Sequence, residues 1–291
     1  MSIKNQIVSI IFIIFNASFF TSASAKETKK TETEAKFSLK KELTTKFNVS
    51  QISFTNWAKG GDNTIAYNSG LVAGLKKNHP QYNWNLHGNF LFGQTKQGDS
   101  GLRNTLDKID IDANITIKEK KYMNPYFSFT LDSQFAKGYD YKKEPPVAKS
   151  GFWDPAYVVE SAGSGIIVGS NFQTKFGIAV KETFTRNFRQ YSDDGKTLDK
   201  KEWLKVEPGL NSRTDFIYHF NHKIKVSSKL ILFSNLEAFN AIDMRWDSNF
   251  QMKLAKYISV DLSLFALYDK DVSLKTQIRQ FLGIGFNYSF F

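Results

Sequence analysis

The chain has 291 residues and no cysteine, which excludes disulfides, thiolate metal sites and a lipid-modified cysteine. Its formal net charge is +11, but Lys and Arg are spread along the sequence instead of clustered on one element, so we expect no nucleic-acid partner. The mean hydropathy of −0.36 does not exclude a membrane protein, because a membrane β-strand is apolar only at every second residue.

The N-terminus has the features of a secretory signal peptide. Lys4 precedes an apolar run from Ile7 to Phe20, and Ala23-Ser24-Ala25 forms a small-residue cleavage site. The run is shorter than the roughly 20 residues that a membrane-spanning helix needs. We therefore expect residues 1–25 to be removed during secretion across the inner membrane.

The next segment, residues 26–48, is predicted to be a flexible periplasmic extension. Residues 26–36 read KETKKTETEAK, which is polar, mixed in charge and without periodicity. Residues 37–47 are only weakly patterned, and they leave open a short periplasmic element or a plug inserted into a lumen. The barrel itself is expected to occupy residues 49–291.

From residue 50 onward the chain is a succession of segments in which apolar and polar residues alternate. In residues 242–254, Ile242, Met244 and Trp246 share one face and Asp243, Arg245 and Asp247 the other. A soluble β-sandwich also alternates, but many of these segments are about 11 to 15 residues long, against the usual five or six of a globular strand. The predicted strands are 50–55, 64–77, 81–94, 104–118, 122–136, 162–172, 174–187, 203–219, 222–238, 242–254, 257–269 and 278–291.

These segments predict an all-β fold, a transmembrane antiparallel β-barrel of about twelve strands. An even strand number is typical of bacterial outer-membrane barrels. The connections alternate between tight turns and mostly longer segments, with 239–241 as a short exception, so we expect both termini in the periplasm. Aromatic residues near strand ends suit interfacial girdles; they are Tyr82, Trp84, Tyr122, Tyr126, Trp203, Tyr257, Tyr268 and Tyr288.

The last strand is similar to the C-terminal signal that the barrel-assembly machinery reads, which implies this machinery as a partner. Aromatic or apolar residues alternate up to the chain end, although the alternation counts back from Phe290 and not from the terminal residue. The expected signal residues are Phe286, Tyr288, Phe290 and Phe291.

Four motifs in order resemble an uncharacterised family of secreted Gram-negative proteins, widespread in bacteroidete-type bacteria and bearing a label of unknown function. The motifs are N-W-A-K-G-G-D-N at 56–63, D-K-I-D at 107–110, F-A-K-G-Y at 135–139 and F-W-D-P-A-Y at 152–157. The resemblance covers about residues 45–291. It implies an outer-membrane barrel and supplies no catalytic or binding residue.

The first motif has two interpretations. Asn56, Trp57, Gly60 and Gly61 lie between two predicted strands, where Gly and Asn favour a turn. A loop site for a glycan or partner, with Trp57 as a stacking platform, is the alternative. The long predicted loop 137–161 similarly leaves open a constriction folded into the lumen or a docking surface on the rim.

Charged and amide residues on the polar faces of the strands are predicted to line the lumen: Lys108, Asp110, Asp112, Asn114, Asp243, Arg245, Asp247 and Asn249. Carboxylates two residues apart on one strand lie about 7 Å apart, close enough for a cation site. We favour pairing across strands over a metal or acid–base site, with ion selectivity of a pore as the intermediate option.

No enzymatic activity is expected. None of the four histidines stands two residues before a serine, as the membrane-embedded phospholipases require, and none is predicted at the extracellular rim, where a protease barrel would need one. No phosphate-binding or dinucleotide glycine motif occurs, so no cofactor and no metal are predicted.

The sequence therefore predicts an integral outer-membrane barrel, in contact with outer-membrane lipid and lipopolysaccharide, that passes or binds small solutes through a charge-lined lumen. The alternative is a closed barrel that anchors an envelope assembly through its extracellular loops and an envelope-protein partner. Twelve strands lie between the eight that side chains fill and the sixteen to eighteen that leave a channel, so strand number does not decide between the two.

Overall fold

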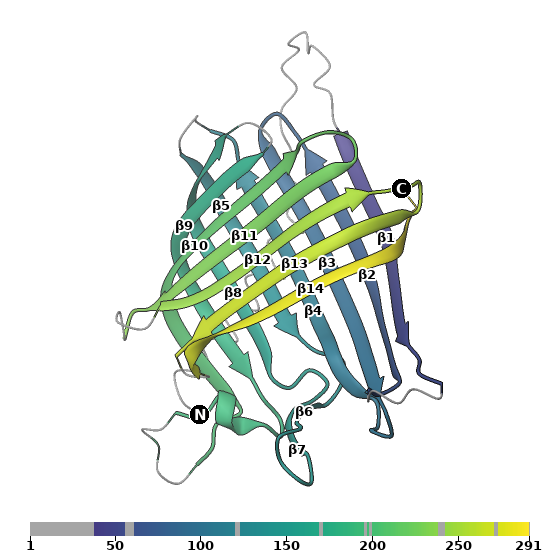
Figure 1. Ribbon diagram of the computed structural model, residues 1–291. Helices are drawn as coiled ribbons and strands as arrows, with labels where there is room; N and C mark the ends of the chain where they lie inside the picture. The colour runs from purple at the N-terminus through teal and green to yellow at the C-terminus, as the bar shows by residue number, and fades with distance from the viewer. Residues whose placement is uncertain are drawn as a thin grey trace. The chain divides into compact units, whose positions relative to one another are not determined.

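Twelve antiparallel strands close into one barrel in the order β1-β14-β13-β12-β11-β10-β9-β8-β5-β4-β3-β2 (Figure 1). The computed structural model describes residues 38–55, 61–119, 123–168, 171–194, 197, 200–237, 242–270 and 273–290. The predicted signal peptide, residues 26–37, Asn56, Trp57, Gly60, Tyr122 and Phe291 lie outside these residues. The barrel strands are β1 (Ser38–Ile52), β2 (Thr64–Asn78), β3 (Tyr82–Gln97), β4 (Arg103–Ile117), β5 (Asn124–Ser133), β8 (Ala156–Val168), β9 (Phe172–Phe184), β10 (Leu204–His219), β11 (Ile224–Asn235), β12 (Ile242–Lys253), β13 (Ile258–Asp269) and β14 (Ser273–Ser289).

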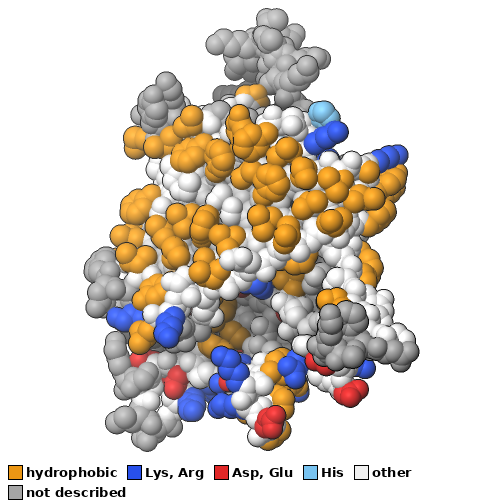
Figure 2. All heavy atoms as spheres, viewed as in Figure 1, with side chains coloured by type: hydrophobic (Ala, Val, Ile, Leu, Met, Phe, Trp, Pro, Cys, Tyr) orange, Lys and Arg blue, Asp and Glu red, His pale blue; other side chains and the backbone are white. Residues whose placement is uncertain are grey.

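The alternating sequence places apolar side chains on the outside of the barrel. Successive residues of a strand point to opposite faces, so Ile278, Leu282, Ile284 and Phe286 share the outer face of β14, where each is at least 49% exposed. Figure 2 shows apolar side chains gathered in a belt over the strands, while Lys, Arg, Asp and Glu gather at the end that carries the loops. The predicted all-β, twelve-stranded antiparallel barrel is confirmed.

The two rims of the barrel differ in their connections. One rim, here the turn rim, carries connections 79–81, 118–123, 169–171, 220–223 and 254–257, together with the start of β1 and the end of β14. The other, the loop rim, carries 53–63, 98–102, 134–155, 185–203, 236–241 and 270–272. An even number of strands thus brings both ends of the barrel chain to the same rim.

The first strand begins earlier than the sequence analysis predicted. Strand β1 starts at Ser38, not at residue 50, so residues 38–48 belong to the wall and not to a flexible segment. The outward residues Leu39 and Leu43 are separated by Lys41, which weakens the alternation. Pairing with β2 over all 15 residues of β1 fixes the strand where the local pattern does not.

The longest loop is shorter and more regular than predicted. Residues 138–161 were not expected to hold strands, yet β6 (Gly138–Asp140) pairs with β7 (Val147–Ser150), and β8 already begins at Ala156. Val158 and Val159 are adjacent apolar residues, so the alternation that identifies a strand is interrupted there. The loop that remains between β5 and β8 spans residues 134–155.

Two glycines allow the wall to curve between β8 and β9. Gly163 and Gly177 lie directly opposite each other, and a Cβ on either one would lie 2.2 Å from a backbone carbonyl oxygen of the neighbouring strand. Any larger residue would push the two strands apart. Glycines of this kind mark tight bends at the corners of barrels.

Three residues of the expected assembly signal, Phe286, Tyr288 and Phe290, lie on the outer face of the chain end at the turn rim. Phe286 and Tyr288 flank Tyr257, with ring centroids 5.6 and 5.8 Å from it, and Tyr288 meets Phe290 edge to face at 4.8 Å. These rings form part of an aromatic band at this rim, as expected for interfacial aromatics.

Candidate functional site

Ion pairs cross the lumen between opposite walls of the barrel. Arg245 of β12 lies 2.7 Å from Asp132 of β5, and Lys108 of β4 lies 3.3 Å from Asp247 of β12. Arg213 of β10 pairs with Asp112 of β4. None of these strand pairs are neighbours in the wall, so the side chains can meet only inside the barrel.

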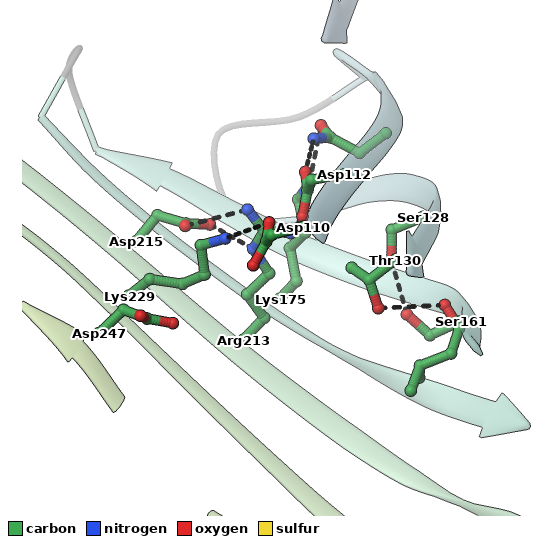
Figure 3. A network of polar contacts seen from close by, with 12 residues as sticks. Asp110, Asp112, Ser128, Thr130, Ser161, Lys175, Arg213, Asp215, Lys229 and Asp247 are labelled. Atoms are coloured by element: carbon green, nitrogen blue, oxygen red, sulfur yellow. Dashed lines mark hydrogen bonds and ion pairs between the residues drawn. The ribbon is translucent and has the colours of Figure 1, made fainter. Parts of the chain in front are cut away.

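Further polar contacts extend these pairs into two adjoining groups, one around Asp110 and one around Asp112, together called the central network; Figure 3 draws part of it. Arg213 also holds Asp215 at 2.7 Å, and Lys229 lies 3.8 Å from Asp110, which Arg245 contacts from the other side. Lys175 donates to the amide oxygen of Asn114 at 3.0 Å. The network comprises Lys108, Asp110, Asp112, Asn114, Asp132, Lys175, Arg213, Asp215, Lys229, Arg245 and Asp247.

A second cluster lies nearer the loop rim. The Lys181 ammonium of β9 lies 2.6 Å from Asp243 and 3.1 Å from Asp269, with Glu207 at 4.0 Å. Lys205 pairs with Glu207 at 3.1 Å on its own strand. Like the central network, this cluster links strands that are not neighbours, because β9 and β12 are separated by two strands.

A third cluster lies toward the turn rim and joins the two ends of the barrel wall. The Asp261 carboxylate of β13 accepts hydrogen bonds from Lys46 of β1 at 3.1 Å, from Gln251 at 2.9 Å and from Ser259 at 2.6 Å. Because β14 lies between β13 and β1, the Lys46–Asp261 pair bridges it on the lumen side.

The central network fills the middle of the lumen. Asp112 and Lys175 are each 2% exposed, and Arg213 is 8% exposed. Burying a charge without a partner costs several kcal/mol; Asp112 and Arg213 meet each other, and the Lys175 ammonium is met by the amide oxygen of Asn114 and the Tyr126 ring. As the structure stands, these side chains obstruct a straight path along the barrel axis.

The sequence analysis placed the predicted lumen residues on the correct face of their strands. Lys108, Asp110, Asp112, Asn114, Arg245 and Asp247 meet in the central network, and Asp243 lies in the cluster near the loop rim. Asn249 also points inward, opposite Ser263, and within the described part of the chain its Oδ1 atom is buried without a hydrogen bond.

Several members of these clusters were not identified from the sequence: Asp132, Lys175, Lys181, Glu207, Arg213, Asp215, Lys229, Asp261 and Asp269. These residues occupy the polar positions of strands in which apolar and polar residues alternate, the same pattern that identified Lys108 and Asp243. Tyr126, expected in an interfacial girdle, points inward instead, where the Lys175 ammonium lies 5.3 Å from its ring centre. The girdle prediction was wrong for this residue because Tyr126 shares the polar face of β5 with Ser128.

Two aspartates hold the long loops against the barrel. The Asp107 carboxylate accepts the backbone N–H groups of Phe135 at 2.7 Å and Ala136 at 2.8 Å. The Asp154 carboxylate accepts those of Arg186 at 3.1 Å and Asn187 at 2.7 Å. Three of the sequence motifs, D-K-I-D, F-A-K-G-Y and F-W-D-P-A-Y, thus contribute to loop anchoring.

The described part of the first motif, residues 61–63, leads into β2. Gly61 has φ +131°, a conformation that glycine adopts readily, and the Phe54 ring lies so close that a Cβ would be 2.8 Å from it. The Asn63 side chain accepts the backbone N–H of Phe54 at 2.7 Å. These contacts agree with the turn interpretation for residues 61–63.

The loop rim also carries a groove of about 560 Å³ lined by Phe152, Trp153, Phe184, Thr185 and Arg186. Beside it, the short 3₁₀ helix η1 (Arg189–Tyr191) is held by the buried Ser192, whose hydroxyl donates to the carbonyl of Glu202 at 2.7 Å. Burial raises the pKa of the Tyr191 hydroxyl above its ordinary value. The groove is wide and shallow, and its aromatic lining suits the edge of an apolar belt.

Among the described residues, no group of three or more His, Asp or Glu side chains is arranged to hold a metal ion. No helix in this part of the chain is long and apolar enough to cross a membrane.

Comparison with known proteins gives one family match and two similar folds. A family model described as "Protein of unknown function (DUF3078)" matches residues 49–139, which include the first three motifs. No curated protein sequence matches the chain. The translocator domain of the autotransporter NalP from Neisseria meningitidis is 9% identical, with TM-score 0.38, and the match covers 97% of this chain and 95% of that one. The COG4313 outer membrane channel from Pseudomonas putida F1 is 8% identical, with TM-score 0.37, and the match covers 90% and 99%. The match to a family of unknown function thus covers the end of β1 and all of β2, β3, β4 and β5.

Proposed function

We propose that the protein is an integral outer-membrane barrel that passes a small charged solute through its lumen. The membrane location is supported by three features: a secretory signal sequence, a closed barrel without free edges over most of its wall, and an apolar outer belt (Figure 2). The turn rim with both chain ends would face the periplasm, and the loop rim the exterior. The solute is expected to pass through chemically unchanged.

The observation that carries the proposal is the balance of charge inside the central network. Five cations, namely Lys108, Lys175, Lys229, Arg213 and Arg245, face five carboxylates, namely Asp110, Asp112, Asp132, Asp215 and Asp247. An ion pair in a lumen exchanges partners with an incoming ion at little net cost, whereas an apolar plug offers no such replacement. The network thus acts as a polar gate that opens when a solute charge takes the place of one partner.

The gate can be tested by recording single-channel openings and ion preference in planar bilayers. Wild-type protein should show rare, brief openings. Arg213→Gln removes the cation that joins Asp112 to Asp215 and should increase the open time and the preference for cations, because two carboxylates then remain in the lumen.

A matched control is Lys205→Gln. It also removes one lumenal cation, but the carboxylate that Lys205 contacts at 3.1 Å, Glu207, lies on its own strand, whereas Arg213 contacts Asp112 across the lumen. This variant should keep the wild-type open time. If Arg213→Gln conducts no better than Lys205→Gln although both barrels are folded, the gated-passage proposal is wrong.

The alternative is a permanently closed barrel that anchors an assembly through its loops. The near-complete burial of Asp112 and Lys175 favours it, and so does the fixation of the long loops by Asp107 and Asp154. Under this alternative Arg213→Gln stays silent, and Asp154→Ala releases a co-purifying envelope protein in mild detergent. Conductance of the first variant therefore separates the two functions.

A further inference from the structure

The barrel wall is incompletely paired at one place, between β1 and β14; we call this place the seam. Strand β14 pairs with β1 only from Thr44–Ser289 to Phe47–Phe286, four residues of each strand, whereas β2 pairs with all 15 residues of β1. Among the described residues, no strand pairs with the β1-facing edge of β14 from Thr276 to Gly283, whereas Gly285 still lies against Asn48 and Phe47 of β1. In Figure 1, β14 diverges from β1 toward the loop rim, and the far wall is visible between them.

The seam lies within the apolar belt. The outer face of β14 beside it carries Ile278, Leu282 and Ile284, which are 63%, 71% and 63% exposed. Backbone N–H and C=O groups without partners are not tolerated against hydrocarbon, but they are tolerated where they line a water-filled space. Figure 2 shows the surface hollowed between the apolar belt and the charged loop rim on this side of the barrel. An opening between β14 and β1 therefore has to be hydrated, with the exposed apolar residues of β14 beside it.

The lumen wall beside the seam carries an apolar patch. Phe265 and Leu267 of β13 and Phe281 of β14 share the inward face with Asp261 and Asp269. An amphiphile would find apolar contacts here on both sides of the wall.

One cation lies in the middle of this patch. The Arg279 guanidinium of β14 packs on the Phe265 ring, 5.0 Å from its centre; within the described residues no ion pair holds it, and the Asp247 and Asp132 carboxylates attract it only from farther away. Lys108 and Arg245 approach the same ring at 5.8 and 5.6 Å, but both are paired with Asp110 and Asp247. Arg279 is thus the cation beside the seam that is available to an anionic group.

We propose that the seam is a lateral portal that binds an anionic single-chain amphiphile. The anionic headgroup contacts Arg279 and the exposed backbone edge of β14, and the acyl chain lies between β14 and β1 and reaches the bilayer. A partner β-strand would pair with the backbone edges but would leave the guanidinium of Arg279 without an anion, so an amphiphile fits the charge better. This proposal rests on the membrane location and not on axial passage through the central network.

The test is photo-labelling of the full-length mature barrel in nanodiscs of zwitterionic lipid. The probe is palmitate with a diazirine at the end of its chain, and labelled residues are mapped by mass spectrometry. We expect the label on β1, β13 and β14 near the seam. Arg279→Gln should weaken the apparent affinity about tenfold, the loss that corresponds to one charge-assisted hydrogen bond.

Three comparisons make the test specific. Lys205→Gln, which removes a lumenal cation far from Arg279 in the strand order, should label like the wild type. The methyl ester of the probe lacks the negative charge and should bind the wild type as weakly as the acid binds Arg279→Gln. A diazirine-labelled phosphatidylglycerol in place of the fatty acid distinguishes a membrane phospholipid from a free carboxylate as the source of the headgroup.

The proposal is overturned if the label spreads evenly over the belt, if Arg279→Gln labels like the wild type, or if the seam is found cross-linked to a second copy or a partner strand. Conductance of Arg213→Gln is recorded on the same preparation. If Arg213→Gln does not conduct but still labels at the seam, axial passage is contradicted and the portal is not. If it conducts but does not label at the seam, the portal is contradicted and axial passage is not.

Discussion

The wall from β4 to β13 and the seam between β14 and β1 are built from strands of similar sequence pattern but are held together differently. Along β4 to β13, neighbouring strands pair over most of their length, and ion pairs connect opposite walls. At the seam, pairing is confined to Thr44–Phe47 of β1, with Lys46–Asp261 as the ion pair that bridges the strands. Alternation of apolar and polar residues is sufficient to make a strand, but it does not determine how far two strands pair.

The two regions are expected to differ in rigidity. The ion-paired wall is rigid, because each crossing charge fixes two distant strands at once. The seam has few interactions to lose when it opens, and regions that move are drawn from those with few buried contacts. Changes in the wall should therefore affect stability, and changes at the seam should mainly affect opening.

Arg213→Gln should have the largest effect on stability. It leaves Asp112 and Asp215 without their main cation, and breaking a buried ion pair typically costs about 3–5 kcal/mol. Urea unfolding of the barrel in lipid vesicles measures the loss. Lys205→Gln is the control and should change the midpoint little; equal midpoints for the two variants would contradict a special role for the crossing pairs.

Two engineered cysteine pairs should come next in effect. Thr45→Cys with Tyr288→Cys joins residues that already pair, and since the chain has no other cysteine, the oxidised form should be more stable by about 2–4 kcal/mol. The second pair, Gln51→Cys with Leu282→Cys, places cysteines at two positions that would face each other if β1 and β14 continued to pair in the register of Thr45 and Tyr288.

The second pair should oxidise more slowly, because cysteines whose Cα atoms are more than about 7 Å apart cannot be bridged without backbone movement. The rate is read from the shift of the cross-linked band on a gel. Equal oxidation rates for the two pairs would show that the seam is closed in solution and that β14 and β1 pair as fully as the other strands.

Asp261→Asn should have the smallest effect. It keeps the side-chain shape but removes the charge that Lys46 contacts, and a hydrogen bond to a charged group contributes about 1.5–3 kcal/mol. Hydrogen exchange of the β14 amides at 286–289 should accelerate, because the four paired residues of β14 and β1 then lose the Lys46–Asp261 ion pair that stabilises them. Unchanged exchange there would show that the backbone pairing alone holds the seam.

The sequence predicted the barrel and the inward residues of β4 and β12 because alternation is a local property of each strand. It could not predict that Arg213 meets Asp112, since that contact depends on how twelve strands are staggered around the axis. Strand β1 was placed too late because Lys41 interrupts its outer face. The short pairing of β14 was not predictable either, because the alternation in residues 282–290 is regular whether or not β1 accompanies it.

The return of both ends of the barrel, Ser38 and Ser289, to one rim limits how such a barrel changes length during evolution or engineering. Adding or deleting a single strand would carry one end of the barrel to the other rim, so only whole hairpins can be gained or lost without moving it. Loop-rim connections such as 236–241 and 270–272 lie between the two strands of a hairpin, and peptide inserted there would emerge at the rim opposite to both ends of the barrel. The barrel therefore grows in units of two strands, and in the proposed orientation an epitope in one of these connections lies across the membrane from the start of β1 and the end of β14.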